Sequence, residues 1–246
     1  MLRFLWQPIY VAYALGTFLA SVLLAFPVFV LISIGNNKKA RKAIWLIIHY
    51  WGKGWLWLIG MPLKIQGSPP RAGRYIIVAN HISYLDAIVI FPAIPLYFRP
   101  LAKKEFARMP VLGYIYKQVA LLVDRSSQHS RSKSMRLMYR TLRHEASILI
   151  FPEGTFNETG TPLKAFYDGA FRLAINTHVP VLPVLFPDTQ DRWHYSGWWK
   201  GSPGRNRAVF LEPVPVAGMT MEDLPVLKQH VYEMMEAAMT RLRNGR

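Results

Sequence analysis

The stretch Asn80-His81-Ile82-Ser83-Tyr84-Leu85-Asp86 follows one apolar run, 75–79, and precedes another, 87–91. This order predicts a strand that ends in a loop and continues into a helix, and Ser83 with Asp86 three residues later fits a capping box. On one continuous helix His81 and Asp86 would point roughly 140° apart, so their side chains can meet only if His81 lies in the loop. An aspartate that accepts from one imidazole nitrogen leaves the other nitrogen to take a proton, as in a general base. For an isolated pair of this spacing, a structural loop histidine and a capping aspartate are the commoner interpretation.

After residue 67, β-rich apolar runs alternate with helical patterns. The alternation predicts an α/β domain, with a mixed, largely parallel central sheet flanked by helices. Strands are expected at 75–79, 98–102, 119–124, 147–151, 181–186 and 207–212, and helices at 84–95, 132–145, 166–177 and 222–243. The turn-rich link Gly67-Ser68-Pro69-Pro70 divides the chain into an N-terminal membrane anchor, residues 1–66, and an α/β domain, residues 67–246.

The composition of the chain narrows the classes of partner that it is expected to bind. The chain of 246 residues is 52% hydrophobic, has a formal charge of +16 and contains no cysteine. The charge favours an anionic partner surface: lipid, an acidic carrier protein or nucleic acid. Nucleic acid is disfavoured, because the uncharged run 9–34 has no use there and no known binding motif is present. Without cysteine the chain has no disulfide, thiol nucleophile or Cys-ligated metal.

Residues 1–66 are expected to form a membrane-associated helical hairpin. The uncharged run 9–34 is long enough to cross about 30 Å of hydrocarbon, and a signal peptide is less favoured because the apolar core is too long. The basic turn 36–42 is expected on the cytoplasmic side of the membrane, with the catalytic domain on the same face. In a bacterium this is the inner membrane. The segment 42–59 predicts an interfacial helix that contacts the membrane through its tryptophans, Trp45, Trp51, Trp55 and Trp57. Packing of this helix on the globular domain is the alternative, and the sequence leaves open whether the first helix spans the membrane or returns.

Three further blocks follow along the chain. Phe151-Pro152-Glu153-Gly154-Thr155 leaves a strand at the sheet edge where open α/β folds bind ligands. Lys103-Lys104-Glu105 precedes Val123-Asp124-Arg125, in which the Arg125 guanidinium has a geometry suited to a phosphate. Val179-Pro180-Val181-Leu182-Pro183-Val184 carries two prolines in an apolar run, which predicts an edge strand or a wall rather than a central strand.

In their order along the chain, 80–86, 103–125, 151–155 and 179–184, the four blocks resemble the lysophosphatidic acid acyltransferase family, also called 1-acylglycerol-3-phosphate acyltransferases, over residues 75–185. The resemblance implies that His81 is the general base and Asp86 its partner. It also implies that Glu153, Gly154 and Thr155 help to hold the glycerol acceptor. Arg125, with Lys103 or Lys104, is expected to meet the acceptor phosphate.

Two positions depart from the family pattern. Phe156 stands where an arginine usually follows Glu-Gly-Thr, and Tyr167 stands where members often have lysine. Two positive charges expected near the acceptor are therefore missing, although Lys164 can replace one. An acceptor with another headgroup, a lyso-aminolipid or a lysophospholipid, is the main alternative, and a non-catalytic membrane scaffold is a weaker one.

The resemblance implies a reaction that transfers a fatty acyl group from acyl-CoA or acyl carrier protein to the free hydroxyl of 1-acylglycerol-3-phosphate, giving phosphatidic acid for phospholipid synthesis. The thiol leaves readily, so no cofactor or metal is expected. Expected partners are the anionic membrane surface, the lysolipid acceptor and, as one possible donor, acyl carrier protein. The other histidines are interpreted as surface or packing residues, and the aromatic stretch 193–200 as either an interfacial segment or one packed on the domain.

Overall fold

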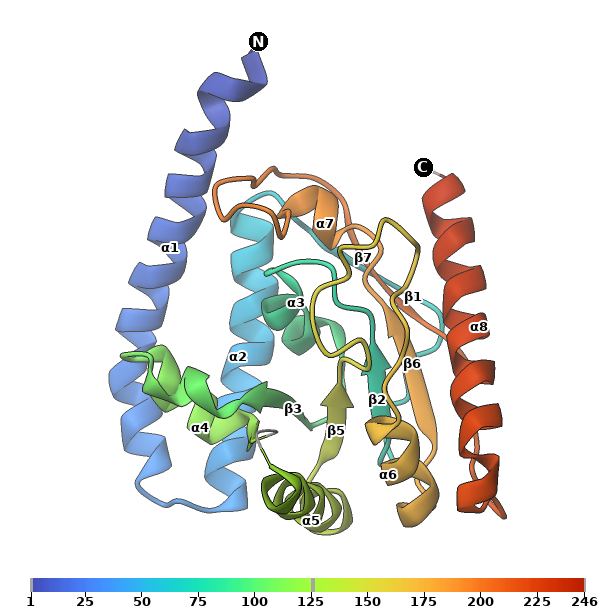
Figure 1. Ribbon diagram of the computed structural model, residues 1–246. Coiled ribbons are helices and arrows are strands. Elements are labelled where there is room, and N and C mark those ends of the chain that lie inside the picture. Colours follow the sequence, from blue (N-terminus) through green and yellow to red (C-terminus); the bar gives the residue numbers. More distant parts are fainter. Residues whose placement is uncertain (1, 125–126, 246) are drawn as a thin grey trace. The chain divides into compact units, whose positions relative to one another are not determined.

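The computed structural model describes residues 2–124 and 127–245, and they fall into two compact units (Figure 1). The first unit contains the chain up to Gln66 together with His81–Pro95 and Phe186–Val209. The second contains Gly67–Asn80, Leu96–Leu185 and Phe210 onward. One break therefore lies at the expected link, between Gln66 and Gly67. The N-terminal segment nevertheless shares its unit with the His81–Asp86 stretch, which the sequence alone did not indicate.

The first unit is built around two antiparallel helices that lie side by side (Figure 1). Tyr10 donates to the carbonyl of Ile59 over 2.7 Å, and the Trp55 indole donates to Thr17 over 3.2 Å, so the N-terminal half of α1 is joined to the C-terminal end of α2. The elements of this unit are α1 (Leu2–Ser33), α2 (Lys38–Leu58), β1 (Leu63–Gln66), α3 (Asp86–Ala93), α7 (Thr189–Arg192) and β7 (Asn206–Phe210).

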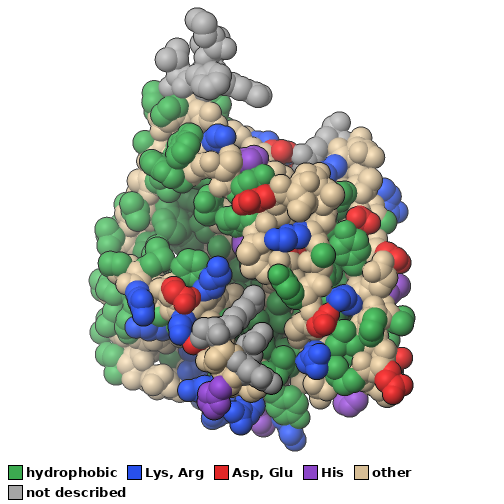
Figure 2. Space-filling view, in the orientation of Figure 1, with side chains coloured by type: hydrophobic (Ala, Val, Ile, Leu, Met, Phe, Trp, Pro, Cys, Tyr) green, Lys and Arg blue, Asp and Glu red, His purple; other side chains and the backbone are tan. Residues whose placement is uncertain are grey.

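Within the described residues one helix, Trp6–Ser33, is long and apolar enough to cross a membrane, by length and composition. Figure 2 shows hydrophobic side chains gathered along this helix. The expected apolar helix 9–34 is thus present as α1. The expected interfacial helix 42–59 is present as α2, which begins earlier because the Asn37 side chain caps it by accepting from Ala40 N–H.

The second unit is a parallel sheet with helices packed on it. Five strands lie in the order β6-β2-β5-β3-β4, and every strand pair is parallel. Helix α5 contacts β4 and β5, α6 contacts β2, and α8 contacts β6. The elements are β2 (Ile76–Ala79), β3 (Phe98–Lys103), η1 (Lys104–Arg108), α4 (Leu112–Val119), β4 (Leu121–Val123), α5 (Gln128–His144), β5 (Ser147–Ile150), α6 (Gly169–Thr177), β6 (Val181–Leu185), η2 (Met221–Asp223) and α8 (Leu224–Asn244).

The expected fold class is confirmed, as a mostly parallel sheet of seven strands flanked by helices. All four residues of β2 are buried, as in central parallel strands covered on both faces. All six expected strands and all four expected helices of residues 67–246 are present. The missed elements include β1, which pairs in parallel with β7, and the helices α4 and α7.

The expectation of an edge strand at 181–186 is wrong. Strand β6 pairs with β2 on one side, where Val78 is in register with Pro183. On its other side Pro183 O accepts from Leu211 N–H over 3.1 Å, and Val181 forms an antiparallel bridge with Val214. The strand tolerates proline because its carbonyl still accepts a hydrogen bond, while only the donor is lost.

Candidate active site

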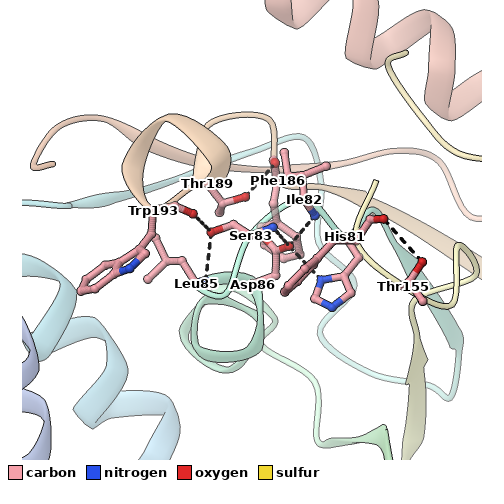
Figure 3. A network of polar contacts seen from close by, with 10 residues as sticks. His81, Ile82, Ser83, Leu85, Asp86, Thr155, Phe186, Thr189 and Trp193 are labelled. Atoms are coloured by element: carbon pink, nitrogen blue, oxygen red, sulfur yellow. Dashed lines mark hydrogen bonds and ion pairs between the residues drawn. The ribbon is translucent and has the colours of Figure 1, made fainter. Parts of the chain in front are cut away.

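His81 and Asp86 meet, as their spacing predicted for a histidine in the loop. The Nδ1 atom of His81 lies 3.0 Å from Oδ2 of Asp86, and Asp86 is the first residue of α3 (Figure 3). The Asp86 side chain is fully buried, whereas 20% of the His81 side chain is exposed. A carboxylate that accepts from Nδ1 places the proton of the neutral ring there and makes Nε2 the basic nitrogen. A base that is partly exposed and an orienting group that is fully buried suit proton transfer to a bound substrate.

The Asp86 carboxylate also organises the loop that carries the histidine. Its Oδ2 atom accepts from the backbone N–H groups of Ile82, over 2.7 Å, and Ser83, over 2.8 Å. These two bonds fix the loop backbone, and the third bond, to His81, fixes the ring. One carboxylate oxygen therefore holds both the loop backbone and the histidine ring in place.

Ser83 has a role that the sequence did not reveal. The expected capping box is half formed: Asp86 accepts from Ser83 N–H, but Ser83 Oγ accepts from Leu85 N–H over 3.0 Å rather than from Asp86 N–H. The hydroxyl of Ser83 donates to the carbonyl of Trp193, and Ser83 also forms an antiparallel bridge with His194 (Figure 3). Ser83 therefore ties the loop of His81 to a distant segment, 186–209, in the same unit.

Helix α2 packs directly on α3, the helix that Asp86 begins. His49 is buried, and its Nδ1 atom lies 2.7 Å from the carbonyl oxygen of Phe91. A β-carbon at Gly52 would lie 3.0 Å from Cδ of Pro92, so the two helices approach closely there. Burial lowers the pKa of His49 from its usual 6.5. The neutral imidazole can donate to Phe91 through Nδ1, which gives this packing histidine a defined tautomer.

Two of the four tryptophans expected at the membrane are buried inside the protein. Trp45 is 3% exposed and stacks on His49, while Trp55 is 4% exposed and packs edge-on against Phe18 of α1. Their expected membrane contact is wrong, because these faces of α2 pack on protein. Trp57 is 74% exposed, and its membrane contact, like that of Trp51, stays a prediction.

The Glu153-Gly154-Thr155 turn is supported by Lys164. Glu153 is fully buried and its Oε2 atom accepts from Lys164 N–H over 3.0 Å. The Lys164 ammonium donates to Thr155 Oγ1 over 2.8 Å. Gly154 has φ of 75°, a conformation that favours glycine. The turn thus presents an exposed hydroxyl beside a cation, at the point where Lys164 was expected to replace a missing charge.

The structure describes two of the three residues that are expected to bind phosphate. Lys104 begins η1 directly after β3, and its ammonium is paired with Asp124. Lys103 is the last residue of β3 and is exposed. Arg125 lies outside the described residues. The two lysines therefore lie at the carboxyl end of a parallel strand, the edge where open sheets bind ligands, and their role in phosphate binding stays a prediction.

An imidazole–carboxylate pair that follows a strand of a mostly parallel α/β sheet can serve as a general base, as in enzymes that deprotonate a bound hydroxyl. The family model described as Acyltransferase matches residues 63–186. A mouse protein named 1-acyl-sn-glycerol-3-phosphate acyltransferase alpha is 30% identical over 89% of this chain and 76% of its own. The chain belongs to the Acyltransferase family.

Other relatives agree. The enzyme from Limnanthes douglasii named 1-acyl-sn-glycerol-3-phosphate acyltransferase is 30% identical over 69% of this chain, and the match spans 60% of that enzyme's length. The crystal structure of the 1-acyl-sn-glycerophosphate acyltransferase PlsC from Thermotoga maritima has a TM-score of 0.76. The two sequences are 24% identical, and the match covers 98% of this chain and 97% of the PlsC chain. This similarity supports the fold.

Proposed function

We propose that the protein transfers a fatty acyl group from an acyl thioester, acyl-CoA or acyl carrier protein, to the free hydroxyl of 1-acylglycerol-3-phosphate, giving phosphatidic acid. The observation that carries the proposal is the 3.0 Å contact between His81 Nδ1 and Asp86 Oδ2 in a chain of this family. The names of the relatives support the acceptor. The apolar helix α1 supports action at a membrane, with the catalytic residues on its cytoplasmic face.

The proposed mechanism has one nucleophile, the acceptor oxygen. His81 Nε2 takes the hydroxyl proton as the oxygen attacks the thioester carbonyl carbon, and the imidazolium that forms is stabilised by Asp86. Collapse of the tetrahedral intermediate forms the ester, breaks the C–S bond and releases a thiolate, which takes the proton back from His81. No covalent enzyme intermediate is formed, and the histidine returns to its starting state.

The acceptor headgroup is proposed to meet positively charged side chains. Lys103, Lys104 and Arg125 are the candidates for its phosphate, and Lys164 adds a cation beside Thr155. A lyso-aminolipid or another lysophospholipid is the second candidate acceptor, because Phe156 and the exposed Tyr167 stand where two basic side chains were expected.

A thioester-consumption assay with a panel of lysolipids tests the proposal. Thiol release should be fastest with 1-acylglycerol-3-phosphate and should fall at least about 10²-fold in His81→Ala, the range for loss of a positioned base. His129→Ala, at an exposed position of α5, is the matched control and should keep wild-type turnover. Preference for an acceptor without a phosphate would overturn the acceptor, and near wild-type turnover of His81→Ala would overturn the mechanism.

A further inference from the structure

Residues 193–201, here called the tryptophan loop, expose two large aromatic side chains in the first unit. Trp198 is 61% exposed and Trp199 is 52% exposed. A soluble surface rarely keeps adjacent indoles in water, whereas indoles are enriched at the level of lipid headgroups. Lys200, the next residue, is also exposed and brings a positive charge.

Internal contacts fix the conformation of the tryptophan loop. The Trp193 indole is buried and donates to the carbonyl of Trp198 over 2.7 Å, while a β-carbon at Gly197 would lie 2.9 Å from the indole of Trp199. The base of the loop is closed by a buried ion pair in which Arg207 donates twice, over 2.7 Å, to Asp188. The hydrogen bonds to this carboxylate raise the pKa of Arg207, so the guanidinium keeps its charge. The two exposed indoles are therefore held outward by a fixed backbone.

The loop lies against the apolar helix. A β-carbon at Gly201 would lie 3.0 Å from Cγ2 of Val11 in α1, and Gly204 N–H donates to Gly60 O after α2 over 2.8 Å (Figure 1). Near that place α1 exposes Ile9 and Tyr13, and the end of α2 exposes Trp57. Three segments that expose aromatic and apolar side chains thus lie together at one end of the helix pair.

We propose that the tryptophan loop is a second membrane-contact element, which seats Trp198 and Trp199 in the headgroup region of an anionic bilayer beside the N-terminal part of α1. Continuity with α1 and the adjacent Lys200 identify a lipid surface as the occupant. Because Ser83 donates to Trp193 O, this contact is one hydrogen bond away from the loop that carries His81.

Depth measurements with spin labels test the proposal without using activity. The chain contains no cysteine, so Trp198→Cys and Trp199→Cys each place one unique label. Leu24→Cys, 80% exposed on α1, gives the lipid reference, and Val226→Cys, 68% exposed on α8, gives the aqueous reference. Full-length protein is placed in vesicles of phosphatidylcholine and phosphatidylglycerol, and relaxation by oxygen and by a water-soluble nickel chelate is compared.

We expect a label at residue 198 or 199 to be relaxed more by oxygen and less by the chelate than a label at residue 226. Its depth in the bilayer should be shallower than that of the label at residue 24. If both labels behave like that at 226, the loop faces water and the proposal is overturned. If both labels are shielded from both reagents, a protein covers the loop, which also overturns it. Trp198→Cys is the cleaner variant, since Trp199 packs on Gly197. Neither failure would affect the proposed acyl transfer.

Discussion

The Nδ1 atom of His49 in α2 lies 2.7 Å from the carbonyl oxygen of Phe91 in α3. This bond joins the helix pair of residues 1–66 to the helix that Asp86 begins. The imidazole is buried against Trp45, and burial, opposed in part by the bond to Phe91, lowers its pKa below 6.5. Lys53, on the same helix, lowers the pKa further. The contact is therefore made by a neutral ring.

Acid should weaken the fold through His49. The unfolded chain takes up a proton below about pH 6.5 and the folded chain does not, so the free energy of unfolding falls as the pH drops through that value. In His49→Gln the amide can still donate to Phe91 but does not titrate, and the loss of stability between about pH 7 and pH 5 should be smaller. Denaturant unfolding at several pH values measures this. His129→Gln, at an exposed site, should keep the wild-type slope.

Asp86→Asn should reduce turnover while leaving the loop largely in place. The amide oxygen can still accept from Ile82 and Ser83, but the charge that stabilises the imidazolium is lost. We expect turnover to fall by at least about 10²-fold, as for loss of a working acid–base pair. Asp86→Ala removes all three bonds and should also lower the unfolding temperature. Thiol release and thermal unfolding separate the two effects, and an active Asp86→Asn enzyme would contradict the role of the charge.

Ser83→Ala should destabilise the protein, because the Trp193 carbonyl and the Leu85 N–H both lose a partner at a fully buried site. Each unmet buried group costs about 1–3 kcal/mol, and each kcal/mol lowers the unfolding temperature by about 2–4 °C in a chain of this size. Ser202→Ala, which removes a more exposed bond to the Asp191 carbonyl, is the matched control and should shift the temperature much less. Equal shifts in the two variants would show that the Ser83 bond has no special weight.

Lys164→Met should weaken binding of a phosphate-bearing acceptor. A hydrogen bond to a charged group contributes about 1.5–3 kcal/mol, so the KM for 1-acylglycerol-3-phosphate should rise by roughly tenfold or more. Lys164→Arg keeps the charge and should restore most of the affinity. Both variants keep the backbone N–H that Glu153 accepts. An unchanged KM in Lys164→Met would mean that the ammonium only donates to Thr155 and does not contribute to acceptor binding.

The strands of residues 67–246 were predictable because they are buried on both faces and form continuous apolar runs, as β2 and β5 do. Strand β1 was missed because Lys64 interrupts a short run just before the turn at Gly67. Helix α4 was missed because its eight residues lie between Pro110 and an apolar strand, which left no clear period.

The His81–Asp86 contact was predictable because both residues belong to one short stretch. Ser83 was not, because its partner Trp193 is 110 residues away and sequence pattern carries no such information. The tryptophans of α2 show a related limit. A helix that is apolar on nearly every side does not reveal which side meets lipid and which meets protein, so Trp45 and Trp55 could not be told apart from Trp57.

The close approach of Gly52 to Pro92 has a practical consequence for anyone who wants this enzyme without detergent. Cutting the chain at Gln66 would strip the covering from α3 and leave the Phe91 carbonyl without its imidazole partner, directly behind the reactive pair. A water-soluble form of the enzyme is better obtained by replacing exposed apolar residues of α1, such as Leu24 and Leu31, with polar ones. Every residue of α2 should be kept.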